Sequence, residues 1–219
     1  MNIVQQIEKF LPLKINLTLL IYLIFAFILA TIIGTLSHEA GHYLAAKSVG
    51  MDAQIHYAYT HWEYPAGRVK EITDTERTLF ALGGPLQTML TGIIGLILLH
   101  YSRKKIKSQG KLKLKYWLYV FLALFWLRQV ANLAVWIMVY LLWGSVSICG
   151  DEIRLAYYFN FPAWSILVPT AIIGFLVTVF VIFKYIPVLQ RCTFIFAGLI
   201  GGLWGYYLWL MLLGPMIIP

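Results

Sequence analysis

One short cluster in this chain has residue types and spacing that could do chemistry, Ser37-His38-Glu39-Ala40-Gly41-His42. In a helix, His38 and His42 lie four residues apart on one face, where two imidazole nitrogens can bind one Zn²⁺. Glu39 lies on the adjacent face, close enough to take a proton from a water at the metal without binding the metal itself. The pattern predicts a zinc centre for hydrolysis, with Glu39 as general base.

The alternative is that the two histidines are ordinary buried side chains, because so short a pattern also arises by chance. Chance is a poor explanation here, since the whole chain has only five His and nine Asp plus Glu. The cluster also ends an uncharged run over residues 17–36. An ionisable residue in or beside a membrane span costs about 2.5 to 3.5 kcal/mol to insert, so it is a functional candidate by default. We therefore favour the metal site.

The composition is that of an integral membrane protein. Of 219 residues, 61% are hydrophobic and only 12% are charged, which is far from the average for soluble domains. The net charge of +8 does not indicate a nucleic-acid partner, because seven of the seventeen Lys and Arg lie at 103–115 between two apolar runs. Cytoplasmic loops of membrane proteins have this pattern. We expect one membrane domain over residues 1–219, surrounded by lipid.

Five apolar runs are long enough to cross a bilayer as helices. They cover residues 17–36, 79–99, 116–143, 164–183 and 192–213. The first run is expected to continue as one helix through the histidine cluster to about Lys47. The sequence thus predicts an all-α polytopic membrane protein, with a catalytic core at about 15–160 and additional helices at 164–219.

The polar connection after the first span predicts a small β-hairpin. Residues 55–61 have the aromatic content and alternation of a strand, and 65–67 suit a turn into a second strand near 68–72. Such a hairpin could pair with an extended substrate backbone by strand addition. It could equally be a plain connection.

Polar residues within and just after the third span are further candidates for the site. Arg128 and Asn132 lie one turn apart within it, where polar groups need partners. Asn132 could contact a substrate, or the two side chains could bond each other and nearby carbonyls, which we favour for Arg128. After this span, Asp151 could cap a helix over 152–159, or act as a third zinc ligand, with Glu152 as the alternative ligand.

The basic residues predict the orientation. With the N-terminus in the cytoplasm, eleven of the seventeen Lys and Arg lie on the cytoplasmic side and five on the other, as the positive-inside rule favours. The end of the first span, the start of the second and the end of the third then share one face. His38, His42, the segment 83–85 and Asp151 are therefore expected to converge.

Two segments resemble a known family. Residues 34–50, Gly-Thr-Leu-Ser-His-Glu-Ala-Gly-His-Tyr-Leu-Ala-Ala-Lys-Ser-Val-Gly, resemble the first catalytic helix of the site-2 protease family of intramembrane zinc metalloproteases. Residues 82–86, Leu-Gly-Gly-Pro-Leu, are similar to that family's Gly-Pro-Leu segment. The resemblance covers the first span to about Asp151. It implies that His38 and His42 bind zinc, that Glu39 is the general base, and that the substrate is a transmembrane or membrane-associated protein.

The chain departs from the family in three respects. It has no Leu-Asp-Gly to supply the third ligand, for which Asp151 is the best substitute by position. Gln87 and Thr88 stand where an asparagine is usual. The distribution of basic residues predicts that the site opens away from the cytoplasm, whereas in many members of the family it opens toward the cytoplasm. An intramembrane protease remains the expectation; the alternatives are an inactive scaffold or binding relative of the same fold and, less supported because no internal repeat is present, a transporter.

Overall fold

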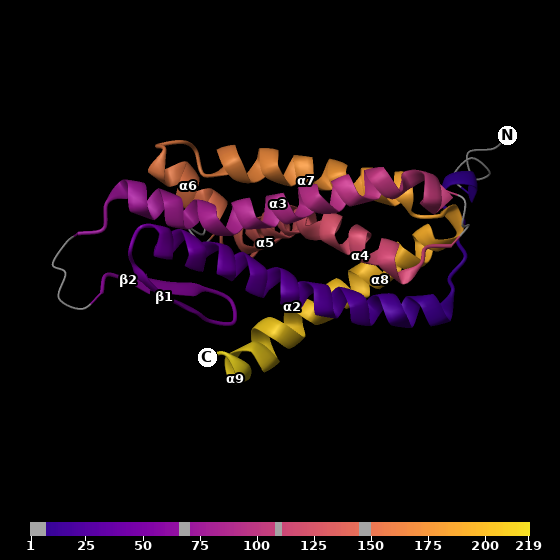
Figure 1. The fold of residues 1–219 in the computed structure, drawn as a ribbon, viewed down its shortest axis with the longest axis horizontal. Helices are drawn as coiled ribbons and strands as arrows, with labels where there is room; N and C mark the ends of the chain where they lie inside the picture. The colour runs from indigo at the N-terminus through magenta and orange to yellow at the C-terminus, as the bar shows by residue number, and fades with distance from the viewer. Residues whose placement is uncertain (1–7, 66–70, 108–110, 145–149) are drawn as a thin grey trace.

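The computed structural model describes residues 8–65, 71–107, 111–144 and 150–219. Within them, five helical segments are long and apolar enough to cross a membrane: Leu17–Ser48, Asp74–Ile106, Leu114–Trp143, Trp164–Tyr185 and Val188–Ile217. Figure 1 shows these segments as one elongated bundle, with a two-stranded sheet beside one end. The predicted all-α polytopic fold with a small hairpin is confirmed.

Helix α2 (Leu17–Ser48) carries both the first span and the histidine cluster, as predicted. It begins where the side chain of Asn16 accepts a hydrogen bond from the backbone N–H of Leu19 (2.9 Å). It ends before Gly50, whose φ of 76° is in the left-handed region. Its 32 residues measure about 48 Å at 1.5 Å per residue. Because a hydrocarbon core is only about 30 Å thick, one continuous helix can span it and hold the histidines at one end.

The hairpin forms, but its turn lies inside the segment 55–61 that was predicted to be one strand. Strands β1 (Asp52–Ile55) and β2 (Thr60–Glu63) pair antiparallel, with Ile55 opposite Thr60. Residues 56–59, which were expected inside one strand, instead make the turn. The backbone N–H of His56 donates to the carbonyl of Tyr59 (2.8 Å), and their rings stack. The expected second strand near 68–72 falls largely on residues outside the described ranges.

Contacts with the end of the chain explain this shift. The Tyr57 N–H donates to the carbonyl of Ile218 (3.0 Å), and the indole N–H of Trp209 donates to the carbonyl of Tyr57 (2.8 Å). The side chain of His56 also contacts the carbonyl oxygen of Pro219. No local pattern in the sequence could indicate that a segment 150 or so residues away fixes this turn.

Helix α3 (Asp74–Lys107) runs alongside α2 at very short range. An added Cβ at Gly41 would lie 2.4 Å from the carbonyl oxygen of Gly83, and one at Gly83 would lie 2.5 Å from that of Gly41. The Gly-Gly-Pro segment thus brings the backbones of the two helices into direct contact. The helix continues through this segment, with Pro85 inside it.

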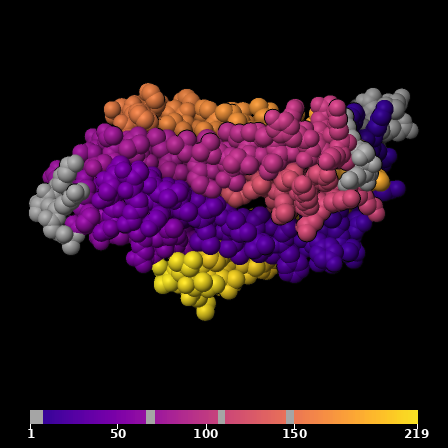
Figure 2. All heavy atoms as spheres, viewed as in Figure 1, coloured from indigo at the N-terminus to yellow at the C-terminus, as the bar shows by residue number. Residues whose placement is uncertain are grey.

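The third span consists of two consecutive α-helices joined by one 3₁₀ turn. Helix α4 (Leu114–Ala123) passes through a 3₁₀ turn, Leu124–Trp126, into α5 (Leu127–Trp143). A short helix, α6 (Asp151–Tyr158), follows. Helix α7 (Trp164–Tyr185) packs on α5, and α8 (Val188–Tyr207) packs on α2. Figure 2 shows the end of the chain, in yellow, lying against the first helix, in indigo.

The fifth span continues past α8 through the π-helical segment Leu208–Leu213 into α9 (Gly214–Ile217). At the other end of the bundle, an apolar core joins five helices. Its buried members include Leu23, Phe27, Leu99, Trp117, Val120, Val181 and Phe194. Figure 1 shows α6 and the hairpin at the end of the bundle opposite to the chain's N-terminus. The two ends of the bundle therefore differ in what they bury.

Candidate metal centre

Three potential ligand atoms converge where α2 meets α6. Asp151 Oδ2 lies 2.9 Å from His38 Nε2 and 3.2 Å from His42 Nε2, and the two imidazole nitrogens are 3.2 Å apart. Tetrahedral zinc with bonds of about 2.0 to 2.1 Å separates its ligand atoms by about 3.3 Å. The triangle therefore has the size of one face of such a site. The predicted convergence of these residues is confirmed.

The partners of the two rings determine which nitrogen carries hydrogen. His42 Nδ1 lies 2.6 Å from the carbonyl oxygen of Phe80, which can only accept, so this nitrogen is the donor. His38 Nδ1 lies 2.9 Å from the hydroxyl of Thr88, which donates its own hydrogen to the carbonyl of Gly84 (3.0 Å). The hydroxyl therefore accepts from His38. When both rings are neutral, Nε2 of each is left with a free lone pair.

These lone pairs make the group suited to a cation. Two bare imidazole nitrogens and a carboxylate oxygen repel one another at about 3 Å unless a positive charge lies between them. His38 and His42 are 1% and 4% exposed, so water screens this repulsion poorly. Hydrogen bonds from the far nitrogen to a hydroxyl or a carbonyl are the usual support for zinc-binding histidines. Two imidazoles and a carboxylate are also a common donor set for catalytic zinc.

Gly84 provides the space for an ion. An added Cβ would lie 2.4 Å from His42 Nε2 and 2.5 Å from His38 Nε2. Any side chain at this position would therefore fill the place where both nitrogens point. The Gly-Gly-Pro segment thus has two separate roles, because Gly83 brings the helices together and Gly84 keeps the centre open.

Glu39 is held by the hairpin. Its side chain is buried, and the hydroxyl of Thr60 lies 3.1 Å from Glu39 Oε2 and 3.0 Å from the Glu39 carbonyl oxygen. Thr60 is the first residue of β2. The position of the carboxylate therefore depends on the hairpin, which in turn contacts the end of the chain.

Asp151 and Glu152, the two neighbouring acidic residues, contact different partners. The cap considered as the alternative role of Asp151 is not formed. Gly150 is the N-cap, with a φ of 126° that favours glycine, and the Asp151 carboxylate lies against the histidines. Glu152 is 1% exposed, and the amide of Asn132 donates to both of its carboxylate oxygens at 3.3 Å. Burial raises the pKa of the Glu152 carboxyl above its ordinary value. Glu152 is therefore bound to Asn132 and not part of the triangle.

Other sequence candidates lie elsewhere. The expected bond between Arg128 and Asn132 is replaced by the bond from Asn132 to Glu152. The two histidines of the hairpin region also lie away from the triangle: His61 pairs with Glu63 at 3.6 Å, and His56 contacts the carbonyl oxygen of Pro219. Among the described residues, the triangle is the one place where three such side chains meet.

The sequence analysis missed the supporting roles of four groups. Thr88 and Gly84 are one turn apart on α3. Helical spacing could therefore have predicted that Thr88 lies beside the metal centre together with Gly84. The carbonyl of Phe80 and the hydroxyl of Thr60 have no signal in the sequence, because they reach the site through tertiary packing.

Comparisons of the chain with protein-family models, with curated proteins and with solved structures find no match.

Proposed function

We propose that this protein is an intramembrane zinc metalloprotease that cleaves membrane-embedded or membrane-associated proteins. The observation that carries the proposal is the triangle of two lone-pair nitrogens and one carboxylate oxygen, with sides of 2.9 to 3.2 Å, and a buried glutamate in the same helix. His38, His42 and Asp151 would hold the ion. Three protein ligands leave a fourth position open, as catalytic zinc requires.

Each residue then has a defined task. Zinc, when bound, supplies polarisation of the peptide carbonyl and acidification of water. Glu39 accepts the proton of the attacking water and returns it to the leaving amine. Thr60 orients the Glu39 carboxylate, while Thr88 and the carbonyl of Phe80 keep the two rings in the tautomer that presents Nε2.

The surroundings support a substrate from the membrane. The site lies at one end of a helix that spans the bilayer, and its histidines are almost wholly buried. A protein segment already within or against the membrane can reach such a site without first being extracted into water. We therefore propose a transmembrane or membrane-associated protein as the substrate.

The test of this function is Glu39→Gln in purified protein. The glutamine can still hydrogen-bond but cannot accept a proton, so we expect one zinc per chain and no cleavage of membrane-span peptides. His38→Ala should lose both the zinc and the activity. Cleavage by Glu39→Gln at the wild-type rate would refute Glu39 as the general base. One zinc per chain without cleavage by the wild-type protein would leave an inactive, zinc-holding scaffold as the better account.

We also propose that the N-terminus is cytoplasmic and that the centre opens to the opposite face, as the charge distribution favours. Single cysteines at Lys111→Cys and Glu63→Cys, in a background without Cys149 and Cys192, separate the two orientations. An impermeant thiol reagent should label position 63 and not position 111 in intact cells. The reverse pattern would invert the orientation.

A further inference from the structure

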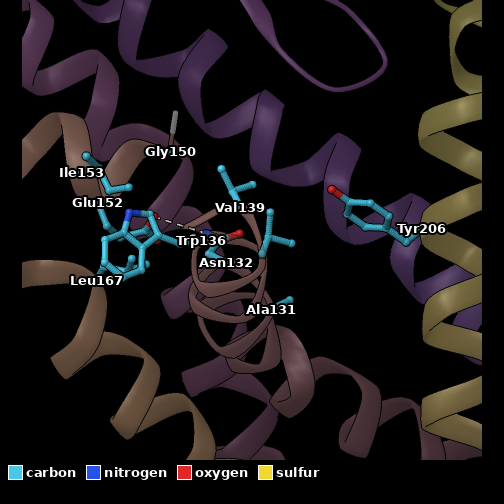
Figure 3. Close-up of a pocket in the computed structure, with 10 residues that line it drawn as sticks. Ala131, Asn132, Trp136, Val139, Gly150, Glu152, Ile153, Leu167 and Tyr206 are labelled. Atoms are coloured by element: carbon cyan, nitrogen blue, oxygen red, sulfur yellow. Dashed lines mark hydrogen bonds between the residues drawn. The ribbon is translucent and has the colours of Figure 1, made fainter. Parts of the chain in front are cut away.

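A second feature, a cavity of about 180 Å³, lies between the third span and the end of the chain. Residues 131–139 of α5 form one wall, the start of α6 forms another, and Leu167 of α7 and Tyr206 of α8 complete it. Figure 3 shows Tyr206 facing α5 across this space. Because α5 packs on α7 and α8 packs on α2, the cavity occupies the interval between two separately packed helix pairs.

The cavity runs from an exposed mouth to a buried end. At the mouth, Val135 and Tyr206 are 36% and 44% exposed, whereas Leu167 and Glu152 at the inner end are each 1% exposed. In a chain whose helices span the bilayer, exposed apolar residues on α5 and α8 face lipid. The mouth is therefore open to the membrane and not to water.

The inner end of the cavity adjoins the candidate metal centre. Gly150 and Glu152 line it, and these residues flank Asp151, whose carboxylate lies 2.9 Å from His38 Nε2. A side chain seated in the cavity would thus contact the residues on either side of a proposed ligand of the ion. This is the placement of a subsite for a residue next to the bond to be cleaved.

The size and lining define what fits. Apolar side chains make up most of the wall, and the two polar groups at the inner end, Asn132 and Glu152, already bond each other. The Asn132 amide donates to both Glu152 carboxylate oxygens, so these two groups are engaged with each other at the inner end. A dry apolar cavity of about 150 Å³ is enough to hold benzene. The occupant that matches is therefore an aromatic or large aliphatic side chain.

We propose that this cavity is the specificity subsite, which admits a Phe- or Leu-sized side chain of a membrane-spanning substrate between α5 and α8. The proposal rests on the proteolytic function proposed above. It assigns Asn132 a positioning role, because its amide fixes Glu152 and so shapes the inner end of the cavity, in place of the direct substrate contact considered from the sequence.

Cleavage preference tests the subsite. Membrane-span peptides that carry Ala, Leu or Phe at one scanned position should show, at the position that fills the cavity, at least about tenfold faster cleavage with Leu or Phe than with Ala. Val135→Trp narrows the mouth and should reduce that ratio to about twofold or less, with zinc content unchanged. Met138→Trp is the matched control, because Met138 is an exposed residue of the same helix that does not line the cavity.

A binding measurement separates this proposal from the proteolytic function. A peptide with a photoreactive phenylalanine, added to Glu39→Gln protein, should crosslink to residues 131–139 or to Leu167, and Val139→Phe should compete with it. Crosslinks there without cleavage by wild-type protein would support the subsite and refute the protease. Cleavage with crosslinks elsewhere, or with a preference that Val135→Trp leaves intact, would refute the subsite and leave the protease standing.

Discussion

The two ends of the bundle are held together in different ways. Near the start of α2, large side chains fill the contacts: Phe27 packs edge-on against Phe121, with ring centroids 4.9 Å apart, and also contacts Phe194. Near the end of α2, backbones touch directly at Gly41 and Gly83, and the buried side chains include the polar groups of His38, Glu39 and His42 beside a small apolar cluster. Under the proposed function, the first end serves stability and the second serves chemistry.

The physical reason lies in the solvent. Lipid tails are as apolar as leucine, so helices in a bilayer gain little from burying apolar surface and depend on close packing. Polar groups there are expensive and persist only where partners or ions satisfy them. The glycine contacts at the second end supply close packing without large side chains, which leaves volume for two imidazoles and an ion.

The largest expected effect is the loss of zinc affinity at the second end of the bundle in Gly84→Ala. Its methyl group would occupy the point to which both Nε2 atoms are directed, so zinc affinity should fall by about 100-fold. Equilibrium dialysis against a zinc buffer measures this loss. Gly34→Ala is the control, because an added Cβ at Gly34 meets nothing within 4 Å. Equal zinc affinity in both variants would mean that the ion is not held at this point.

The next effect belongs to the first end. Leu99 is fully buried in the apolar core, and Leu99→Ala should lower the free energy of unfolding by about 2 kcal/mol. This is the low end of the usual range for such a change, since lipid solvates leucine well in the unfolded state. Unfolding in mixed detergent gives the value. Zinc content should stay at the wild-type level; a loss of zinc would show that the two ends are not separable.

The smallest effect concerns the hairpin. Thr60→Val keeps the shape of the side chain and removes the hydroxyl that contacts Glu39. We expect about a tenfold fall in kcat/KM, or about 1.4 kcal/mol, because one hydrogen bond to a charged group is lost. Zinc content should not change, and Thr60→Ser should restore most of the activity. If Thr60→Val is fully active, the hairpin does not orient the base.

The sequence was a good guide where a pattern is local. Helical periodicity and uncharged length placed all five spans, and the spacing of His38 and His42 predicted a shared face. The convergence with Asp151 followed from the order of the spans in the membrane. These inferences need only the direction in which each helix crosses.

The sequence was a poor guide where distant segments fix a position. The turn at 56–59 is held by Trp209 and Ile218, and no local propensity encodes that contact. The choice between Asp151 and Glu152 as the partner of the histidines likewise depended on a single glycine with positive φ, which rotates the start of α6. Asn132 was correctly singled out as needing a partner, but its partner is on another helix.

The central claim is that His38, His42 and Asp151 form one zinc site. The most direct test is to measure zinc binding by two variants, one at Asp151 and one at the neighbouring Glu152. Asp151→Asn keeps the size of the side chain but weakens the ligand, so zinc affinity should fall by at least about tenfold. Glu152→Gln, the neighbouring change, should retain nearly one zinc per chain, because Glu152 bonds Asn132 instead. Full zinc binding by Asp151→Asn together with its loss in Glu152→Gln would contradict the account.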